Sequence, residues 1–214
     1  MTSRDFSVYM CGVGGQGLVL LSNLIGDACA RAGIRVLTGE QHGLSQRSGS
    51  VNIHLRISEE ARSPLIPLGG ADFLLALESL EALRSVEYLR DGGVVIMNNR
   101  VQNSVMETAS HAKDKKARYF SVEDVRERLL EVTDKVFVVD ALSTAREAGN
   151  PLTQNTVMLG ALSTVEDFWV PDEALSEALR ESVPSKAVDV NLKAFELGRK
   201  AAFKGLCNAV KCRE

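Results

Sequence analysis

The chain has few cysteines, few aromatic residues and no excess of positive charge. Its four cysteines stand at positions 11, 29, 207 and 212, without a Cys-x-x-Cys pair. Iron–sulfur clusters and structural zinc need closely spaced thiolates, and the histidines show no metal-ligand spacing, so we expect no metal site on this chain alone. A formal charge of −3 and an aromatic content of 5% argue against nucleic-acid binding by phosphate contacts or base stacking.

Long hydrophobic runs are also absent. No apolar stretch approaches the roughly 20 residues that span a bilayer, and we expect no membrane contact. The first five residues lead into an expected strand rather than into the apolar core of a signal peptide. We therefore expect a cytoplasmic protein. The 214 residues, of which 45% are hydrophobic, suffice for one globular domain.

Apolar segments that alternate with helical stretches predict an α/β fold. Residues 79–90 are expected to form a helix capped by Ser79, and Ser121 and Asp140 are expected to begin two further helices. Strands are expected over residues 6–11, 34–38, 72–77, 94–98 and 136–140. A right-handed crossover would make the first two of these strands parallel neighbours. Residues 50–58 alternate with a period of two, which favours an antiparallel strand.

The last third of the chain is expected to be helical. Helical spacing recurs after Pro151 over residues 155–168, 171–182 and 185–204. Residues 100–118 are polar and irregular, and are interpreted as a solvated insertion. The prediction is a Rossmann-like three-layer sandwich in a single domain, 1–214, with a mainly parallel sheet over 1–150 and a helical layer over 151–214. Cys11 and Cys29 are expected to be buried, and Cys207 and Cys212 to lie near a frayed C-terminus.

A glycine-rich turn follows the first expected strand. Gly12, Gly14 and Gly17 match the dinucleotide-binding pattern G-x-G-x-x-G in spacing and in their strand–turn–helix setting. Glu40 falls where a ribose-binding carboxylate is expected. This favours an NAD(P)-binding oxidoreductase. The same glycines can also serve only to let a helix pack closely against a strand.

Two features count against a simple dehydrogenase. Gly15 and Gln16 place an extra glycine and a large polar amide inside the turn, where a pyrophosphate must approach closely. The chain also lacks a second mononucleotide-binding half, because helices replace strands after Pro151. No Lys-Ser or Lys-Thr pair follows the glycines, which excludes a P-loop because nothing would reach the terminal phosphates.

A second polar segment begins about twenty residues after the turn. It holds four polar residues within seven positions, framed by glycines: His42, Gln46, Arg47 and Ser48, with Gly49 at the end. Arg47 could clamp a carboxylate or phosphate, and His42 could exchange a proton near neutral pH. Each residue alone is better explained as a surface charge or a turn cap. Together, beside the glycine-rich turn at one end of a parallel sheet, they predict a site or an interface.

These segments carry a resemblance to a known family. Residues 11–17, 40–43 and 45–51 together resemble the gamma subunit or domain of the 2-oxoacid:ferredoxin oxidoreductases, and in particular the small (beta) subunits of indolepyruvate ferredoxin oxidoreductases. Ser48 stands where the family often has glycine. The resemblance continues through 69–77, 92–98 and 155–162, and so extends over most of the chain.

The resemblance implies a non-catalytic subunit whose large partner subunit carries thiamine diphosphate, Mg²⁺ and [4Fe–4S] clusters. The complex would decarboxylate a 2-oxoacid, with indolepyruvate implied, while acylating coenzyme A and reducing ferredoxin. This chain would bind no cofactor alone, would be inactive in isolation, could then form a homodimer, and would shape or gate the partner's active site. We expect the following residues to face a cofactor or that active site: Gly12, Gly14, Gly15, Gln16, Gly17, Glu40, His42, Gln46, Arg47, Ser48 and Gly49.

The sequence leaves two alternatives open. The chain could be a stand-alone NAD(P)-binding Rossmann oxidoreductase, which titration with NADH would reveal. It could also be a regulatory module with a structural nucleotide, which would co-purify with it. Which 2-oxoacid is used, whether coenzyme A contacts this chain and the stoichiometry of the complex do not follow from the residues.

Overall fold

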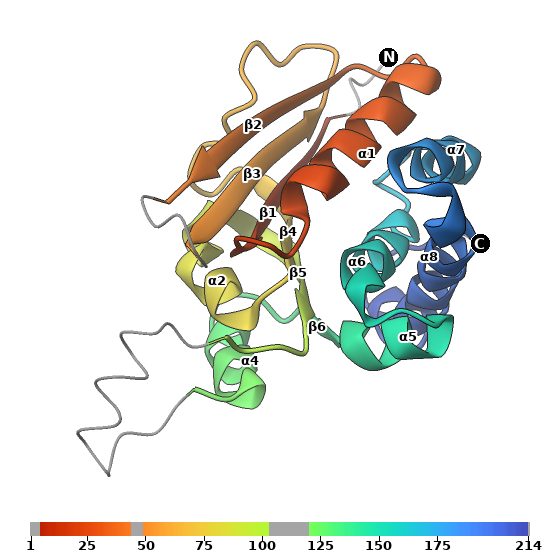
Figure 1. Cartoon of the computed structure of the whole chain (residues 1–214). Coiled ribbons are helices and arrows are strands. Elements are labelled where there is room, and N and C mark those ends of the chain that lie inside the picture. The colour runs from red at the N-terminus through yellow and green to blue at the C-terminus, as the bar shows by residue number, and fades with distance from the viewer. Residues whose placement is uncertain (1–4, 44–48, 103–119, 214) are drawn as a thin grey trace.

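The computed structural model describes residues 5–43, 49–102 and 120–213, and this part of the chain is built on a six-stranded sheet of order β2-β3-β1-β4-β5-β6 (Figure 1). Only β3 runs against its neighbours, β1 and β2, whereas the pairs β1–β4, β4–β5 and β5–β6 are parallel. The strands are β1 (Phe6–Val13), β2 (Val36–His42), β3 (Ser50–Ile57), β4 (Ala71–Ala76), β5 (Leu89–Asn98) and β6 (Val136–Val139). The predicted α/β class with a mainly parallel sheet is confirmed.

Helices cover both faces of the sheet and complete three layers. Figure 1 shows α5 to α8 gathered together beside the sheet, and with α1 they enclose the larger apolar core, whereas α2 and α4 enclose a smaller one. The helices are α1 (Leu18–Arg31), α2 (Ser79–Arg84), α4 (Val122–Leu130), α5 (Ala141–Ala148), α6 (Gln154–Ser163), α7 (Asp172–Ser182) and α8 (Val188–Phe203). Within the described residues, none of them combines the length and apolarity needed to cross a bilayer.

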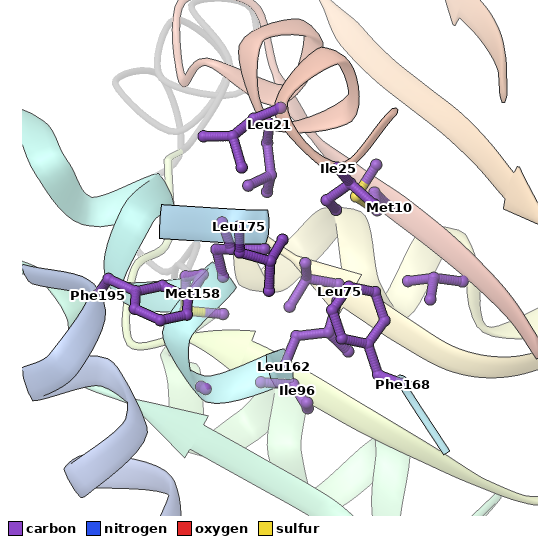
Figure 2. Packing of buried hydrophobic residues seen from close by; sticks show 14 of the residues in the cluster. Met10, Leu21, Ile25, Leu75, Ile96, Met158, Leu162, Phe168, Leu175 and Phe195 are labelled. Carbon is purple, nitrogen blue, oxygen red and sulfur yellow. The ribbon is translucent and has the colours of Figure 1, made fainter. Parts of the chain in front are cut away.

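Strand side chains alternate between the two cores. Phe6, Val8 and Met10 of β1 belong to the larger core, while Tyr9 and Cys11 belong to the smaller one. This alternation follows from the two-residue period of a strand. Figure 2 shows the larger core, in which sheet residues meet helix residues that include Leu21, Ile25, Met158, Leu162, Leu175 and Phe195.

Helices α6 and α8 approach each other through a pair of glycines. A Cβ atom placed on Gly160 would lie 2.1 Å from the carbonyl oxygen of Phe195, and one placed on Gly198 would lie 2.1 Å from the carbonyl oxygen of Val157. Real Cβ atoms do not come this close to backbone. The crossing of α6 and α8 therefore requires glycine at both positions, and it fixes the place of α6 above the sheet.

The expected adjacency of the first two strands is wrong, because β3 lies between β1 and β2. Each of those two strands is antiparallel to β3, so they point in the same direction without touching. Joining β2 and β3 as a hairpin costs little loop-closure entropy, and it places β3 beside β1. Strand β2 also runs on to His42 rather than ending at residue 38.

The helix expected over residues 79–90 is shorter, and Ser79 does not cap it. Helix α2 ends at Arg84 and is capped by Glu78, whose side chain accepts a hydrogen bond from the N–H of Glu81. Strand β5 then begins at Leu89, which pairs with β4 before a register shift. The capping roles of Ser121 in α4 and Asp140 in α5 are confirmed. Most of the expected insertion, residues 103–119, lies outside the described residues.

The C-terminal third is helical, as expected, although α6 ends at Ser163 rather than near residue 168. The C-terminal tail is held in place and is not frayed, contrary to the expectation. Cys207 and Cys212 form a disulfide, and the N–H of Arg213 donates to the carbonyl oxygen of Thr164 over 2.8 Å. Cys11 and Cys29 are free and buried, in line with the expectation that they fill core space.

One histidine is enclosed by aromatic rings on the α2 side of the sheet. His54 of β3 is only 2% exposed, and its ring lies edge-on to Tyr9 with centroids 4.8 Å apart. Its Nδ1 accepts a hydrogen bond from the N–H of Ile66 over 3.0 Å, which places the proton of the neutral ring on Nε2. Among the described residues Nε2 finds no hydrogen-bond partner. Burial lowers the pKa of His54 because the charged ring would lose its water.

We expect this histidine to make folding stability depend on pH. The folded-state pKa lies below the value of about 6.5 in an unfolded chain, so the unfolded chain binds more protons as pH falls through that window. The free energy of unfolding should therefore fall below pH 6.5, by at most about 1.4 kcal/mol per pH unit from this group. Urea unfolding between pH 7.5 and 5 should show this fall in the free energy of unfolding in wild type and in the exposed-site control His42→Gln. The fall should be smaller in His54→Gln. Equal slopes in all three proteins would contradict the assignment.

Candidate functional site

The glycine-rich turn lies at the carboxyl end of the sheet, between β1 and α1. Gly15 and Gly17 have φ angles of +91° and +80°, a left-handed conformation that glycine adopts without strain. Gly17 is the N-cap of α1 and provides no side-chain acceptor, so the first amides of the helix have no side-chain cap. Strand β1 leads to α1 on one face and its neighbour β4 leads to α2 on the other, which is the switch point where α/β proteins bind ligands.

Gln16 closes the turn from the inside. Its Oε1 accepts a hydrogen bond from the N–H of Val13 over 3.0 Å, and a Cβ on Gly12 would lie 2.6 Å from that oxygen. The Nε2 of Gln16 is buried and has no hydrogen-bond partner among the described residues. The large amide inside the turn is therefore part of its framework, and Gly12 is needed to make room for it.

Asn155, at the start of α6, packs against the turn from the other side. Its Nδ2 donates to the carbonyl oxygen of Gly17 over 3.4 Å, across 138 positions of sequence. A Cβ on Gly17 would lie 2.6 Å from the same nitrogen. Gly17 thus serves two purposes, because it takes a left-handed conformation and leaves room for Asn155.

A cleft of about 230 Å³ opens beside the turn. Asn98, at the end of β5, is 2% exposed and organises its base. The Nδ2 of Asn98 donates to the carbonyl oxygen of Leu77 over 3.3 Å, while its Oδ1 accepts from the N–H of Ala141 over 3.2 Å. One buried amide thereby holds together the ends of β4 and β5 and the start of α5. Side chains and backbone that line the cleft include Gly14, Gly15, Arg100, Gln102, Leu152 and Asn155.

A second, more apolar hollow of about 340 Å³ lies on the other side of Gly14 and Gly15. It is formed by aliphatic side chains of β1, α1 and β3, with His42 at its edge. The Nε2 of His42 lies 3.3 Å from a carboxylate oxygen of Glu40, its neighbour on the same face of β2. His42 is therefore next to the turn, as the sequence predicted, whereas Glu40 is engaged with His42.

The two polar segments of the sequence do meet in space. The N–H of Gly14 donates to the carbonyl oxygen of Gly49 over 2.9 Å, so the end of the second segment touches the first. The expected site residues Gln46, Arg47 and Ser48 lie outside the described residues. Sequence reasoning did not single out Asn98 or Arg100, because a lone amide or arginine at a strand end carries no motif. Asn155 was notable only as part of a segment that carries the family resemblance.

The fold and the site define an α/β module: a mainly parallel sheet whose switch point, the place where such folds commonly bind ligands, holds a glycine-rich turn between two hollows. A family model described as pyruvate ferredoxin/flavodoxin oxidoreductase matches residues 7–201. The chain belongs to this family.

Curated relatives match along nearly the whole chain. The chain is 40% identical over 200 residues to the indolepyruvate oxidoreductase subunit IorB of Thermococcus kodakarensis, covering 93% of this chain and 96% of the relative. It is 41% identical over 204 residues to the subunit of the same name from Archaeoglobus fulgidus, covering 95% and 98%. The predicted family resemblance is thus confirmed.

Solved structures share the fold. The pyruvate oxidoreductase subunit PORC of Thermotoga maritima superposes with a TM-score of 0.67 at 24% identity, covering 99% of both chains. The 2-oxoglutarate:ferredoxin oxidoreductase of Magnetococcus marinus, described with 2-oxoglutarate, coenzyme A and succinyl-CoA bound, gives a TM-score of 0.68 at 22% identity. The match covers 94% of this chain and 31% of that longer one, so the same fold occurs there within a larger polypeptide.

Proposed function

We propose that this chain is the small, non-catalytic subunit of a thiamine-diphosphate-dependent 2-oxoacid:ferredoxin oxidoreductase whose substrate is indolepyruvate. In that role the site at the switch point shapes or gates access to the active site of the large subunit. The observation that carries the proposal is that the glycine-rich turn, Asn155 and Asn98 together build a polar cleft with Arg100 in its wall. Relatives about 40% identical over nearly their whole length carry the indolepyruvate name.

The described part of this chain offers no ligand set for the iron–sulfur clusters of the complex. A [4Fe–4S] cluster needs four thiolates, yet Cys11 and Cys29 are buried in different cores, and Cys207 and Cys212 are joined in a disulfide. The described residues also contain no group of three or more His, Cys, Asp or Glu side chains that could hold a metal ion. We therefore assign thiamine diphosphate, Mg²⁺ and the clusters to the large subunit, which would also pass electrons to ferredoxin.

Coenzyme A is the ligand whose chemistry suits the cleft. Its phosphates would accept hydrogen bonds from those backbone amides of the turn that are not already bonded within the chain, as the amides of Gly14 and Gln16 are, and would pair with Arg100, whose side chain reaches Gln102 at the cleft wall. When bound, coenzyme A supplies the thiol that is acylated. A cleft of about 230 Å³ holds only part of so large a molecule, so the remainder would lie against the partner. This chain would orient the coenzyme and exclude water from its path.

A stand-alone NAD(P)-binding oxidoreductase is the alternative, and the place of Glu40 argues against it. In a dinucleotide-binding fold the ribose-binding carboxylate ends the strand next to β1. Here β3 occupies that place, and Glu40 stands one strand further away on β2. Strands are about 4.8 Å apart, so the carboxylate is displaced by roughly that distance from the ribose site.

Reconstitution tests the proposal. Co-expression with the large subunit should give a stable complex, acting in the cytoplasm, that reduces ferredoxin only when indolepyruvate and coenzyme A are both present. The isolated chain should be inactive and should not bind NADH in the micromolar range. Failure of the two subunits to associate, or oxidation of a substrate by the isolated chain, would contradict the proposal.

An exposed leucine at the rim of the cleft gives a sharper prediction about the partner. Leu152 is 82% exposed, and a large apolar side chain at the rim of a polar cleft is a typical contact residue. Leu152→Ser should leave the Tm of the isolated chain unchanged and weaken association with the large subunit about tenfold or more, as expected for an interface anchor. Leu68, 64% exposed and located before β4 at the other end of the sheet, provides the control. Equal affinities of Leu152→Ser and Leu68→Ser would count against a partner at the rim.

A further inference from the structure

Two buried carboxylates stand at the start of α2, next to the cleft. Glu78 and Glu81 are each only 1% exposed. A carboxylate in such a place costs free energy unless hydrogen bonds replace its water. Glu78 is the N-terminal cap of this six-residue helix, and Glu81 lies in its first turn and pairs with Arg84 of the same helix. The hydrogen-bond partners of the two carboxylates show which segments they position.

Glu78 holds in place the chain segment after β5, which forms one wall of the cleft. Its Oε1 accepts from the N–H of Gln102 over 2.7 Å, and its Oε2 accepts from the N–H of Glu81 over 2.8 Å. The Oε1 of Gln102 in turn accepts from the guanidinium of Arg100 over 3.0 Å. The carbonyl oxygen of Arg100 accepts from the N–H of Ser79 over 2.8 Å. Residues 100–102 are thus attached to the start of α2 at two backbone positions, and the side-chain contact between Arg100 and Gln102 lies within the segment itself.

Glu81 fastens the segment behind the glycine-rich turn. Its two carboxylate oxygens accept from the hydroxyl of Ser50 and from the guanidinium of Arg84. Ser50 follows Gly49, whose carbonyl oxygen accepts from the N–H of Gly14 over 2.9 Å. Ser50 also lies opposite Val13 in the β1–β3 ladder, so Glu81 holds the strand end to which the turn is bonded. Arg84 is partly exposed and also balances the charge of the buried carboxylate.

We propose that Glu78 and Glu81 are positioning residues that hold the two sides of the cleft at a fixed distance. Glu78 acts on the wall at residues 100–102, and Glu81 acts through Ser50 and Gly49 on the turn. Three parts of the chain far apart in sequence meet at these two carboxylates. Neither carboxylate touches the cleft itself, so both act through other residues. This inference rests on the proposed function, because it assigns a purpose to the same cleft.

The test uses the assembled complex with Glu78→Gln and Glu81→Gln, and with Glu87→Gln as the control. Glu87 is exposed and lies just after α2. Glutamine keeps the size of the side chain and removes its charge, and in Glu78→Gln the amide nitrogen must also face a backbone N–H that needs an acceptor. Hydrogen exchange should speed up about tenfold at residues 100–102 in Glu78→Gln, and at residues 13–17 and 49–51 in Glu81→Gln, the size expected when a hydrogen bond to a charged group is lost.

Steady-state kinetics then separate positioning from mere stability. Both variants should raise the KM for coenzyme A about tenfold with kcat within twofold of wild type, and Glu87→Gln should match wild type. Unchanged hydrogen-exchange rates in both variants would overturn the inference. So would a fall of kcat in proportion to the decrease in Tm, with the KM for coenzyme A unchanged. Faster exchange with an unchanged KM would support the positioning role and contradict the proposed coenzyme site. If Glu78→Gln fails to assemble, Glu78→Asp keeps the charge but shortens the side chain, and it should raise the same KM and speed exchange at residues 100–102.

Discussion

Gly160→Ala should lower the free energy of unfolding by about 3 kcal/mol, the upper range for overpacking a tight contact. A methyl group on Gly160 would meet the carbonyl oxygen of Phe195 at 2.1 Å and the nitrogen of Arg199 at 3.1 Å. Both atoms are backbone of α8, so they cannot move without shifting the whole helix. Urea unfolding of the isolated chain measures the change, and Gly198→Ala should show a similar loss because the contact is reciprocal.

Gly26→Ala is the matched control for this prediction. Gly26 lies inside α1, and a methyl group added there would have no atom within 4 Å outside its own helix backbone and chain neighbours. Alanine favours a helix interior over glycine by about 1 kcal/mol, so this variant should be more stable than wild type. The same substitution in two helices is thus expected to have opposite signs. If Gly160→Ala were as stable as Gly26→Ala, α6 and α8 would have to lie further apart than described.

Gly17→Ala should reduce the coenzyme A-dependent activity of the complex at least tenfold while costing little stability. The left-handed φ of +80° is strained for alanine by about 1 kcal/mol. The new methyl group would also stand 2.6 Å from the Nδ2 of Asn155. That atom ends a flexible side chain, so it can move at small cost to folding. Its displacement breaks the hydrogen bond to the Gly17 carbonyl and alters the cleft, which is why activity should suffer more than stability.

Gly33→Ala separates the effect of backbone strain from the effect of displacing Asn155. Gly33 follows the other end of α1, and its φ is +67°, so alanine there meets a similar backbone strain. Nothing lies within 4 Å of its added methyl group. Gly33→Ala should lose about 1 kcal/mol of stability and keep activity within twofold of wild type. Equal activity of the Gly17→Ala and Gly33→Ala complexes would show that the turn has no role in the reaction.

Local signals predicted the parts of this fold that depend on neighbouring residues. An apolar run followed by closely spaced glycines gave β1, its turn and α1. Ser121 and Asp140 were identified as caps because an N-cap acts on residues only two or three positions away. The glycine-rich turn and His42 were predicted to lie at the same end of the sheet. This prediction needs only the points at which two strands of the same direction end.

Contacts between distant segments were beyond such reasoning. The insertion of β3 between β1 and β2 is a choice of strand order, which no local pattern encodes. Glu78 replaces Ser79 as the cap of α2 because the rest of the fold buries its carboxylate against Gln102. Asn98 and Asn155 are ordinary amides until the fold brings them to the turn. The interpretation of Glu40 as a ribose-binding carboxylate depended on the same strand order.

The central claim is that the switch-point cleft faces the reaction centre of another subunit. A cryo-electron microscopy structure of the assembled complex with coenzyme A tests it most directly. We expect the rim at Leu152 to be buried against the large subunit, and density for coenzyme A to lie against Gly14, Gly15 and Arg100. A cleft that opens to solvent, away from the thiamine centre and without the coenzyme, would contradict the account.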